Sequence, residues 1–119
     1  MDKPQLLKNI SYAQPQELVE MVQYQDGQVV SRTLAQNPYL SLTLFAFDQG
    51  EGISAHTVTA DALVQVLDGQ AQVRIGDQEV TVSAGQVVAM PEGVPHALDA
   101  HQRFKMLLTV VKRPQPIMT

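Results

Sequence analysis

Apolar and polar residues alternate along most of the chain after Gly27, in short runs that are separated by turn residues. The clearest run covers residues 70–75, where Ala71, Val73 and Ile75 form one set and glutamine and arginine form the other. A period of two is typical of a β-strand with one buried face. This run therefore predicts a strand that turns its aliphatic side chains toward a core.

The same pattern predicts strands over most of the remaining chain. They cover residues 28–34, 40–48, 61–68, 70–75, a run with Val80 and Val82, residues 86–90 and residues 104–111. Asp68-Gly69 and Gly76-Asp77 are typical of hairpin turns. In residues 40–48 both alternating sets contain apolar side chains, so we expect this strand to be covered on both faces. Short strands with frequent turns and almost no helix favour a sandwich or a barrel.

The two ends of the chain do not follow this pattern. Residues 1–27 form an arm in which Pro15 precedes the apolar residues Leu18, Val19, Met21 and Val22. The arm contains either a short helix with proline in its first turn or an extended segment that adds to a neighbouring sheet. Residues 113–119 form a tail with two prolines. The sequence thus predicts an arm at 1–27, a barrel at 28–112 and a tail at 113–119.

Composition limits the function classes. The 119 residues suit one domain, and 45% hydrophobic with 17% charged residues is typical of a globular protein. The net charge of −4 and the scattered basic residues argue against binding of nucleic acid. The absence of cysteine excludes disulfides and thiolate metal sites. With no apolar leader and no membrane-spanning run, we expect a soluble cytoplasmic protein with no membrane contact.

Two histidines carry the candidate chemistry. His56 shares strand parity with Val58, Ala62 and Val64, and His96 shares parity with Leu98. These apolar positions read as inward-facing, so the two imidazoles are predicted to meet inside the barrel. The predicted ligand pocket comprises His56, Val58, Ala62, Val64, His96 and Leu98. The alternative is a structural role, in which both residues are neutral histidines held by backbone hydrogen bonds.

The glycines and prolines around these histidines follow a known pattern. Gly85, Pro91, Gly93 and His96 have the spacing of the second cupin motif, while Gly50, His56 and Gly69 fall on the frame of the first. The chain resembles a small single-domain bacterial cupin, a conserved barrel of the RmlC-like kind. The resemblance covers roughly residues 28–112. It implies an all-β double-stranded β-helix, or jelly-roll barrel, with little helix.

The resemblance also shows which ligands are missing. Cupins use three histidines and a carboxylate to hold iron, manganese, nickel or zinc, and the frame places Val58, Ala62 and Ala100 where the second histidine, the glutamate and the asparagine would stand. Only His56 and His96 remain as metal ligands, and two neutral imidazoles bind a divalent metal weakly. Four nearby side chains have the wrong strand parity to replace the missing ligands, namely Asp61, Gln65, Asp99 and His101.

Three functions stay open on this basis. The first is binding of a small molecule in an apolar barrel cavity, with or without a weak divalent metal site. The second is a metal-dependent dioxygenase or isomerase of a small organic substrate, although no catalytic residue can be assigned. The third is an inert barrel that serves as an assembly partner. Small cupins usually pair, so the resemblance also implies a homodimer, with the apolar residues of the arm at the contact.

Overall fold

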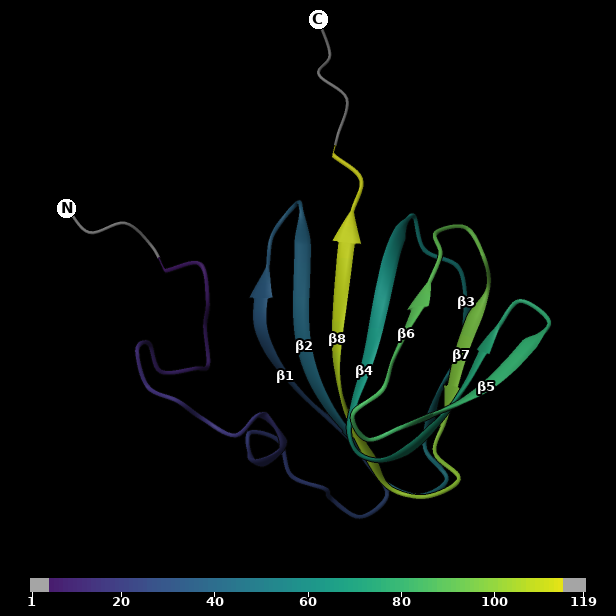
Figure 1. Ribbon diagram of the computed structural model, residues 1–119, viewed down its shortest axis with the longest axis horizontal. Coiled ribbons are helices and arrows are strands. Elements are labelled where there is room, and N and C mark those ends of the chain that lie inside the picture. Colours follow the sequence, from purple (N-terminus) through teal and green to yellow (C-terminus); the bar gives the residue numbers. More distant parts are fainter. Residues whose placement is uncertain (1–4, 115–119) are drawn as a thin grey trace, which may run out of the picture.

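The protein is a curled antiparallel sheet with a long N-terminal arm lying against it (Figure 1). The computed structural model describes residues 5–114. The strands are β1 (Val29–Gln36), β2 (Leu40–Phe47), β3 (Gly52–His56), β4 (Ala60–Ile75), β5 (Gln78–Ser83), β6 (Val87–Met90), β7 (His96–Asp99) and β8 (Phe104–Lys112). A 3₁₀ turn, η1 (Leu18–Glu20), is the one helical element of the described residues. The prediction of an all-β barrel with little helix is confirmed.

Strand β4 holds the two halves of the barrel together. Its first half pairs with β8 and β6, and its second half pairs with β5 and β7. Sheet A therefore consists of β1, β2, β8, the first half of β4 and β6. Sheet B consists of β3, β7, the second half of β4 and β5. The two sheets curl around a common core.

The predicted hairpin turn at Asp68-Gly69 is wrong. The chain runs straight through as β4, and a β-bulge between Val66 and Asp68 marks the point where the strand passes from sheet A to sheet B. Gly69 has a φ of 73°, and a Cβ atom there would lie 2.2 Å from the carbonyl oxygen of Arg103. Positive φ and close backbone approach both require glycine at this bulge. The other predicted turn, at Gly76-Asp77, does connect the hairpin of β4 and β5.

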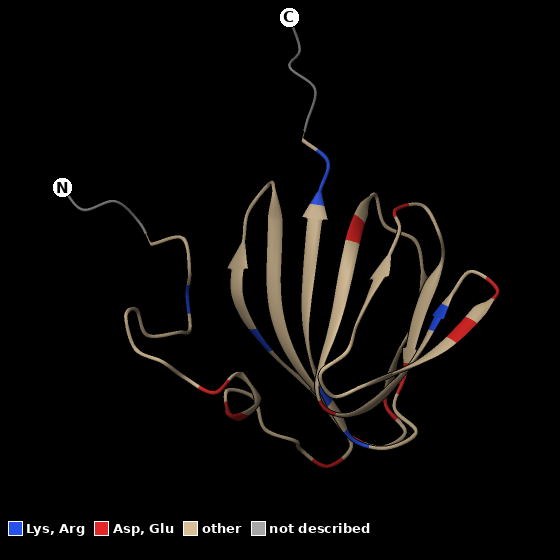
Figure 2. Cartoon of the chain, viewed as in Figure 1, with Lys and Arg blue, Asp and Glu red and all other residues tan. Residues whose placement is uncertain are grey.

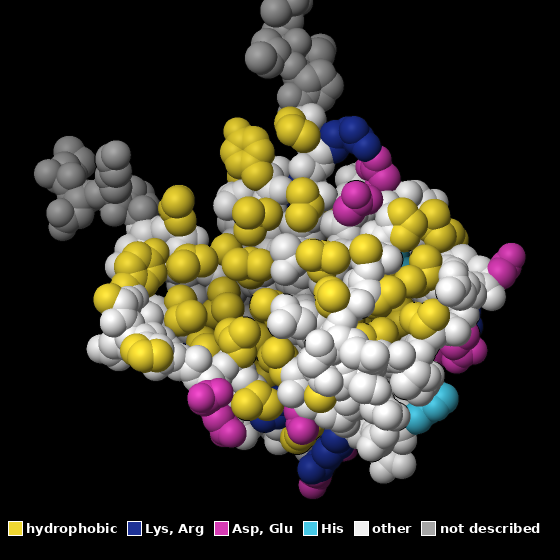
Figure 3. All heavy atoms as spheres, in the orientation of Figure 1, with side chains coloured by type: hydrophobic (Ala, Val, Ile, Leu, Met, Phe, Trp, Pro, Cys, Tyr) yellow, Lys and Arg dark blue, Asp and Glu magenta, His cyan; other side chains and the backbone are white. Residues whose placement is uncertain are grey.

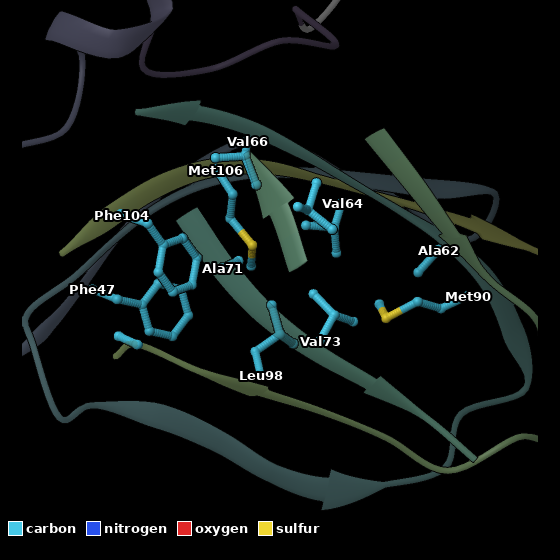
Figure 4. Close-up of a cluster of buried hydrophobic side chains, with 12 residues drawn as sticks. Phe47, Ala62, Val64, Val66, Ala71, Val73, Met90, Leu98, Phe104 and Met106 are labelled. Atoms are coloured by element: carbon cyan, nitrogen blue, oxygen red, sulfur yellow. The ribbon is translucent and has the colours of Figure 1, made fainter. Parts of the chain in front are cut away.

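The core lies between the two sheets and is densely filled (Figure 4). Phe47 and Phe104 stack with ring centroids 4.5 Å apart at one end of the core. Before the bulge the even-numbered residues of β4 are buried, and after it Ala71 and Val73 are buried, so the bulge switches the alternation by one residue. The predicted inward positions of Ala71 and Val73 are confirmed.

The arm packs against the outer face of sheet A. Met21 and Val22 are buried there beside Leu34, Leu44 and Ala46, in a second apolar cluster. Residues 44–47 are thus covered on both faces, which confirms the prediction for the second half of this strand. The described arm is neither a regular helix nor an added strand, and η1 is its one helical turn. Met21 and Val22, expected at a dimer contact, instead cover the chain's own sheet.

Cations on sheet A fasten the arm. The Lys105 ammonium is buried and donates to the carbonyl oxygen of Val19 at 2.7 Å. The Arg32 guanidinium donates to the carbonyl oxygens of Asn9 at 2.8 Å and Met21 at 3.0 Å. These bonds to charged donors are stronger than ordinary ones, so they hold two separate points of the arm on the sheet.

A cluster of polar and charged side chains joins the last residues of the arm to the sheet. Tyr24 donates to Asp68 at 2.5 Å, and burial, followed by the bond to this carboxylate, raises the pKa of Tyr24 well above its usual value. Arg103 donates to Asp48 at 2.7 Å and to Asp26 at 2.6 Å. The Arg103 hydrogen bond is the main cause that lowers the pKa of Asp48 to about 2.

Charged residues are sparse along the strands and more frequent at the ends of the sheet and in the arm (Figure 2). Within residues 5–114, no helix has the length and apolar character needed to span a bilayer.

Candidate functional site

The site is built by the end of β3 and the beginning of β7. His56 is the last residue of β3 and stands opposite His96, the first residue of β7. Their ring centroids lie 4.5 Å apart and the ring planes meet at 64°. A bulge between Ile53 and His56 keeps both of these side chains on the same face as the core residue Leu98. The structure therefore brings the two predicted imidazoles together.

Both imidazoles have the same nitrogen engaged by the backbone. Nδ1 of His56 lies 3.0 Å from the carbonyl oxygen of Ser54, and Nδ1 of His96 lies 3.4 Å from that of Val94. A carbonyl oxygen only accepts, so Nδ1 carries the proton in each neutral ring. The lone pair then resides on Nε2 of each ring. This is the tautomer in which an imidazole accepts a hydrogen bond or binds a metal through Nε2.

Burial differs between the two rings. His56 is exposed, whereas His96 is 5% exposed. Among the described residues, no buried side-chain nitrogen or oxygen lacks a partner, so Nε2 of His96, which makes no hydrogen bond, reaches the surface. Burial is the main cause that lowers the pKa of His96, and repulsion by His56 lowers it further. His96 consequently stays neutral at a lower pH than an ordinary histidine.

A cleft of about 600 Å³ opens at the end of the barrel where β8 ends and β4 begins. We call it the mouth cleft, and its lining combines apolar and charged residues: Pro38, Val58, Thr59, Ala60, Glu92, Val110, Lys112, Arg113 and Pro114. Val58 lies two residues after His56, so their Cα atoms are at most about 7 Å apart. The imidazoles themselves are not among the lining residues. Val58 therefore links the mouth cleft to the strand end that carries His56.

The four apolar residues of the predicted ligand pocket divide into two groups. Val58 is partly exposed and lines the mouth cleft. Ala62, Val64 and Leu98 are 3%, 0% and 2% exposed and belong to the filled core. Met90 pairs with Ala62 across sheet A, and its side chain extends toward Val73 beside Ala62 (Figure 4). Met90 therefore occupies space that a larger residue at position 62 would need, and the prediction that Ala62, Val64 and Leu98 line a ligand pocket is corrected, because they pack in the filled core.

The residues present fit a divalent metal only in part. The ring separation suits two imidazoles bound side by side, since each ring centroid would lie about 3 Å from a metal held at a typical Zn–N distance. Within residues 5–114, however, no three His, Cys, Asp or Glu side chains come close enough to form a metal site. Asp61 faces outward, where it accepts a hydrogen bond from the backbone of Glu92 at 2.8 Å. The donor set does not fit the four-ligand cupin metal centre.

Comparison with known proteins establishes the family. Residues 43–111 match the family described as Cupin domain. The chain belongs to the cupin family. This cupin is 38% identical to a conserved protein of unknown function from Streptococcus pyogenes, with a TM-score of 0.92, and the alignment covers 96% of this chain and 100% of the other. No curated protein matches the sequence.

One further structure supports this assignment, and another shares the fold. A cupin superfamily protein from Desulfitobacterium hafniense is 31% identical, with a TM-score of 0.85 over 90% of this cupin and 98% of that chain. Salicylate 1,2-dioxygenase from Pseudoaminobacter salicylatoxidans has a TM-score of 0.64 at 16% identity, over 70% of this cupin and 26% of that chain. At that identity the likeness shows the fold alone.

Sequence reasoning missed the charged rim of the mouth cleft. Arg113 forms an ion pair with Glu92, and Lys112 donates through its ammonium to the carbonyl oxygen of Asn37 at 3.0 Å. The adjacent cations at 112 and 113 directly follow an apolar strand, and Glu92 lies within the Pro-Glu-Gly turn. The sequence signal for this charged rim was therefore the position of these charged residues, directly after a strand and within a turn.

Proposed function

We propose that this cupin binds a small, mainly apolar molecule at the mouth of its barrel, with His56 and His96 holding the polar end of that molecule. The observation that carries the proposal is the imidazole pair, with rings 4.5 Å apart and both Nδ1 atoms bonded to the chain's own carbonyls. Paired, pre-oriented acceptors beside an apolar cleft are typical of small-molecule sites.

The tautomers suggest the chemistry of the ligand. Two free Nε2 atoms accept hydrogen bonds, so the ligand should carry a hydroxyl or amine donor. Val58, Ala60 and Val110 supply an apolar wall for its body. The rim carries Lys112 and the ion pair of Arg113 with Glu92, and the net positive charge that Lys112 leaves there favours a carboxylate on the ligand. A small hydroxylated aromatic or hydroxy acid combines these features.

A divalent metal has a secondary place in this proposal. His56 and His96 would be its two protein ligands, and the metal would supply a Lewis acid that a ligand hydroxyl could bind. With two imidazoles the affinity should be weak, whether the metal is iron, nickel, manganese or zinc. The same deficit counts against a resident catalytic metal and hence against the dioxygenase or isomerase hypothesis.

Nuclear magnetic resonance of the histidine rings tests the proposal. The untagged protein is labelled with ¹⁵N and titrated separately with Zn²⁺, phenol and salicylate, and the Nε2 signals of His56 and His96 are followed. We expect both Nε2 signals to shift with saturable binding of at least one organic probe, and Zn²⁺ to bind with a Kd of high micromolar or weaker.

The variants His56→Ala and His96→Gln, with His101→Ala as the matched control on an exposed histidine, locate the response. Loss of organic-probe binding in the first two and retention in the third would support the proposal. Tight, stoichiometric Zn²⁺ loading would favour the metalloenzyme instead. No response to any probe would favour the inert barrel.

A further inference from the structure

The two cations of the mouth cleft have different surroundings. Lys112 is the last residue of β8 and shares strand parity with Val110, which packs against the core. Its ammonium, at the open end of the barrel, donates to the carbonyl oxygen of Asn37 at 3.0 Å. Within residues 5–114 it takes part in no ion pair. Because an ammonium donates more than one hydrogen bond, Lys112 keeps its charge and a further donor for a ligand.

Arg113 has its charge compensated within the chain. Its guanidinium forms an ion pair with the carboxylate of Glu92, which belongs to the turn between β6 and β7. The hydrogen bond to Glu92 is the main cause that raises the pKa of Arg113, and the charge of Asp61 raises it further. Figure 3 shows basic and acidic side chains adjoining at the top of the view, next to the end of the described chain. A ligand carboxylate therefore reaches Arg113 only in competition with Glu92.

Glu92 is the better anchored partner of this pair. Its backbone N–H donates to Asp61 at 2.8 Å, and the N–H of Gly93 donates to the carbonyl oxygen of Val58 at 2.9 Å. The side chain of Glu92 is 34% exposed, whereas that of Arg113 is 74% exposed. Exposed ion pairs contribute little to stability, so Arg113 can exchange partners at small cost. The Glu92 carboxylate stays at the cleft when it does.

We propose that Glu92 restricts the mouth cleft to ligands with a single carboxylate. This inference rests on the ligand site proposed above and names the charge of the ligand that the site selects. Lys112 binds one carboxylate, while a second would have to displace Glu92 from Arg113 and would meet the negative charge of Glu92 beside it. With a neutral side chain at position 92, Arg113 would become a second anion-binding group. Glu92 is in this way a specificity-determining residue.

A matched series of ligands tests the inference. Phenol, 3-hydroxybenzoate and 5-hydroxyisophthalate share one phenolic hydroxyl and carry no, one and two carboxylates. Isothermal titration gives the Kd of each. In the wild-type protein we expect 3-hydroxybenzoate to bind tightest. In Glu92→Gln we expect the diacid to bind at least about fivefold tighter than in wild type, which is the scale of one exposed ion pair, and phenol to stay unchanged.

The matched control is Glu79→Gln. It changes the net charge of the protein by the same amount but lies on β5, outside the lining of the mouth cleft. No gain for the diacid in Glu92→Gln, or an equal gain in Glu79→Gln, would overturn the inference. The proposed function would still stand in that case if the wild-type protein binds phenol and 3-hydroxybenzoate. A wild-type protein that binds none of the three probes would overturn both.

Two further variants test the same charges without relying on the folding of Glu92→Gln. Lys112→Met should remove the advantage of 3-hydroxybenzoate over phenol, because it removes the cation that has no carboxylate partner. Arg113→Gln should weaken binding of both acids by about fivefold, because it leaves the Glu92 charge uncompensated at the cleft. Unchanged binding of both acids in Arg113→Gln would also overturn the inference.

Discussion

Replacing Val58 with histidine should create a third metal ligand at the mouth of the barrel. Val58 is partly exposed, so the new imidazole does not have to enter the filled core. Its carbonyl oxygen accepts a hydrogen bond from Gly93 at 2.9 Å, which fixes the backbone at this position. Val58→Ala would remove the same side chain without adding a ligand and serves as a reference.

The size of the effect follows from metal sites in general. Four-ligand zinc sites bind with about 10–16 kcal/mol, or about 3 kcal/mol for each ligand. Each 1.4 kcal/mol is a factor of about ten. Adding one well-placed imidazole to His56 and His96 should therefore tighten Zn²⁺ binding by about 100-fold.

Isothermal titration of the untagged variant with Zn²⁺ at pH 7.5 measures this change. The matched control is Ala55→His, because Ala55 lines a hollow on the outer face of sheet B and a histidine there adds an imidazole away from the pair. Val58→His/His96→Gln should fall back to two-ligand affinity. If Val58→His folds but binds no tighter than Ala55→His, the two imidazoles do not form the metal-facing pair that their geometry indicates.

Three further predictions concern stability. Met90→Ala should lower the free energy of unfolding by about 2–5 kcal/mol in urea, because Met90 is 2% exposed and fills the space beside Ala62; a smaller loss would mean that this space is not filled by Met90. Gly69→Ala should cost more than about 1 kcal/mol, since alanine must adopt a positive φ and displace the Arg103 carbonyl; an unchanged melting temperature would contradict the bulge. The free energy of unfolding should decline as the pH falls below 6.5, because the pKa of His96 is lower in the folded protein and the unfolded chain therefore takes up the proton first. This decline should end once the pH falls below the folded pKa of His96. Denaturation at several pH values checks this, and His96→Gln should lack this part of the decline.

Much of the fold could be predicted because one side of each strand faces a core. Alternation over residues 70–75 gave the correct inward set, and Phe45, Phe47 and Leu44 correctly indicated a strand covered on both faces. Asp68-Gly69 misled because a hairpin turn and a β-bulge both use glycine at positive φ. Short-range sequence does not distinguish the two, since the difference lies in which distant strands pair on either side.

The candidate site was predictable in part for the same reason. The spacing around His56 and His96 indicated that the rings would meet, although the bulge after Ile53 that places His56 opposite His96 left no signal of its own. The filled space beside Ala62 depends on Met90, which is distant in sequence and becomes its neighbour only through strand pairing. Whether a core contains an empty cavity depends on such pairings, so the sequence suggested a cavity where the structure has a side chain.

The continuity of β4 has a consequence for how the protein can be cut or extended. A loop at Asp68-Gly69 would tolerate a protease nick or an inserted tag, but here the peptide bond lies within a strand that both sheets share. Cleavage there would separate the strand partners of β8 from those of β5, and neither fragment would keep a closed core. Engineering of this barrel should therefore use the Gly76-Asp77 hairpin, where the chain reverses at the surface.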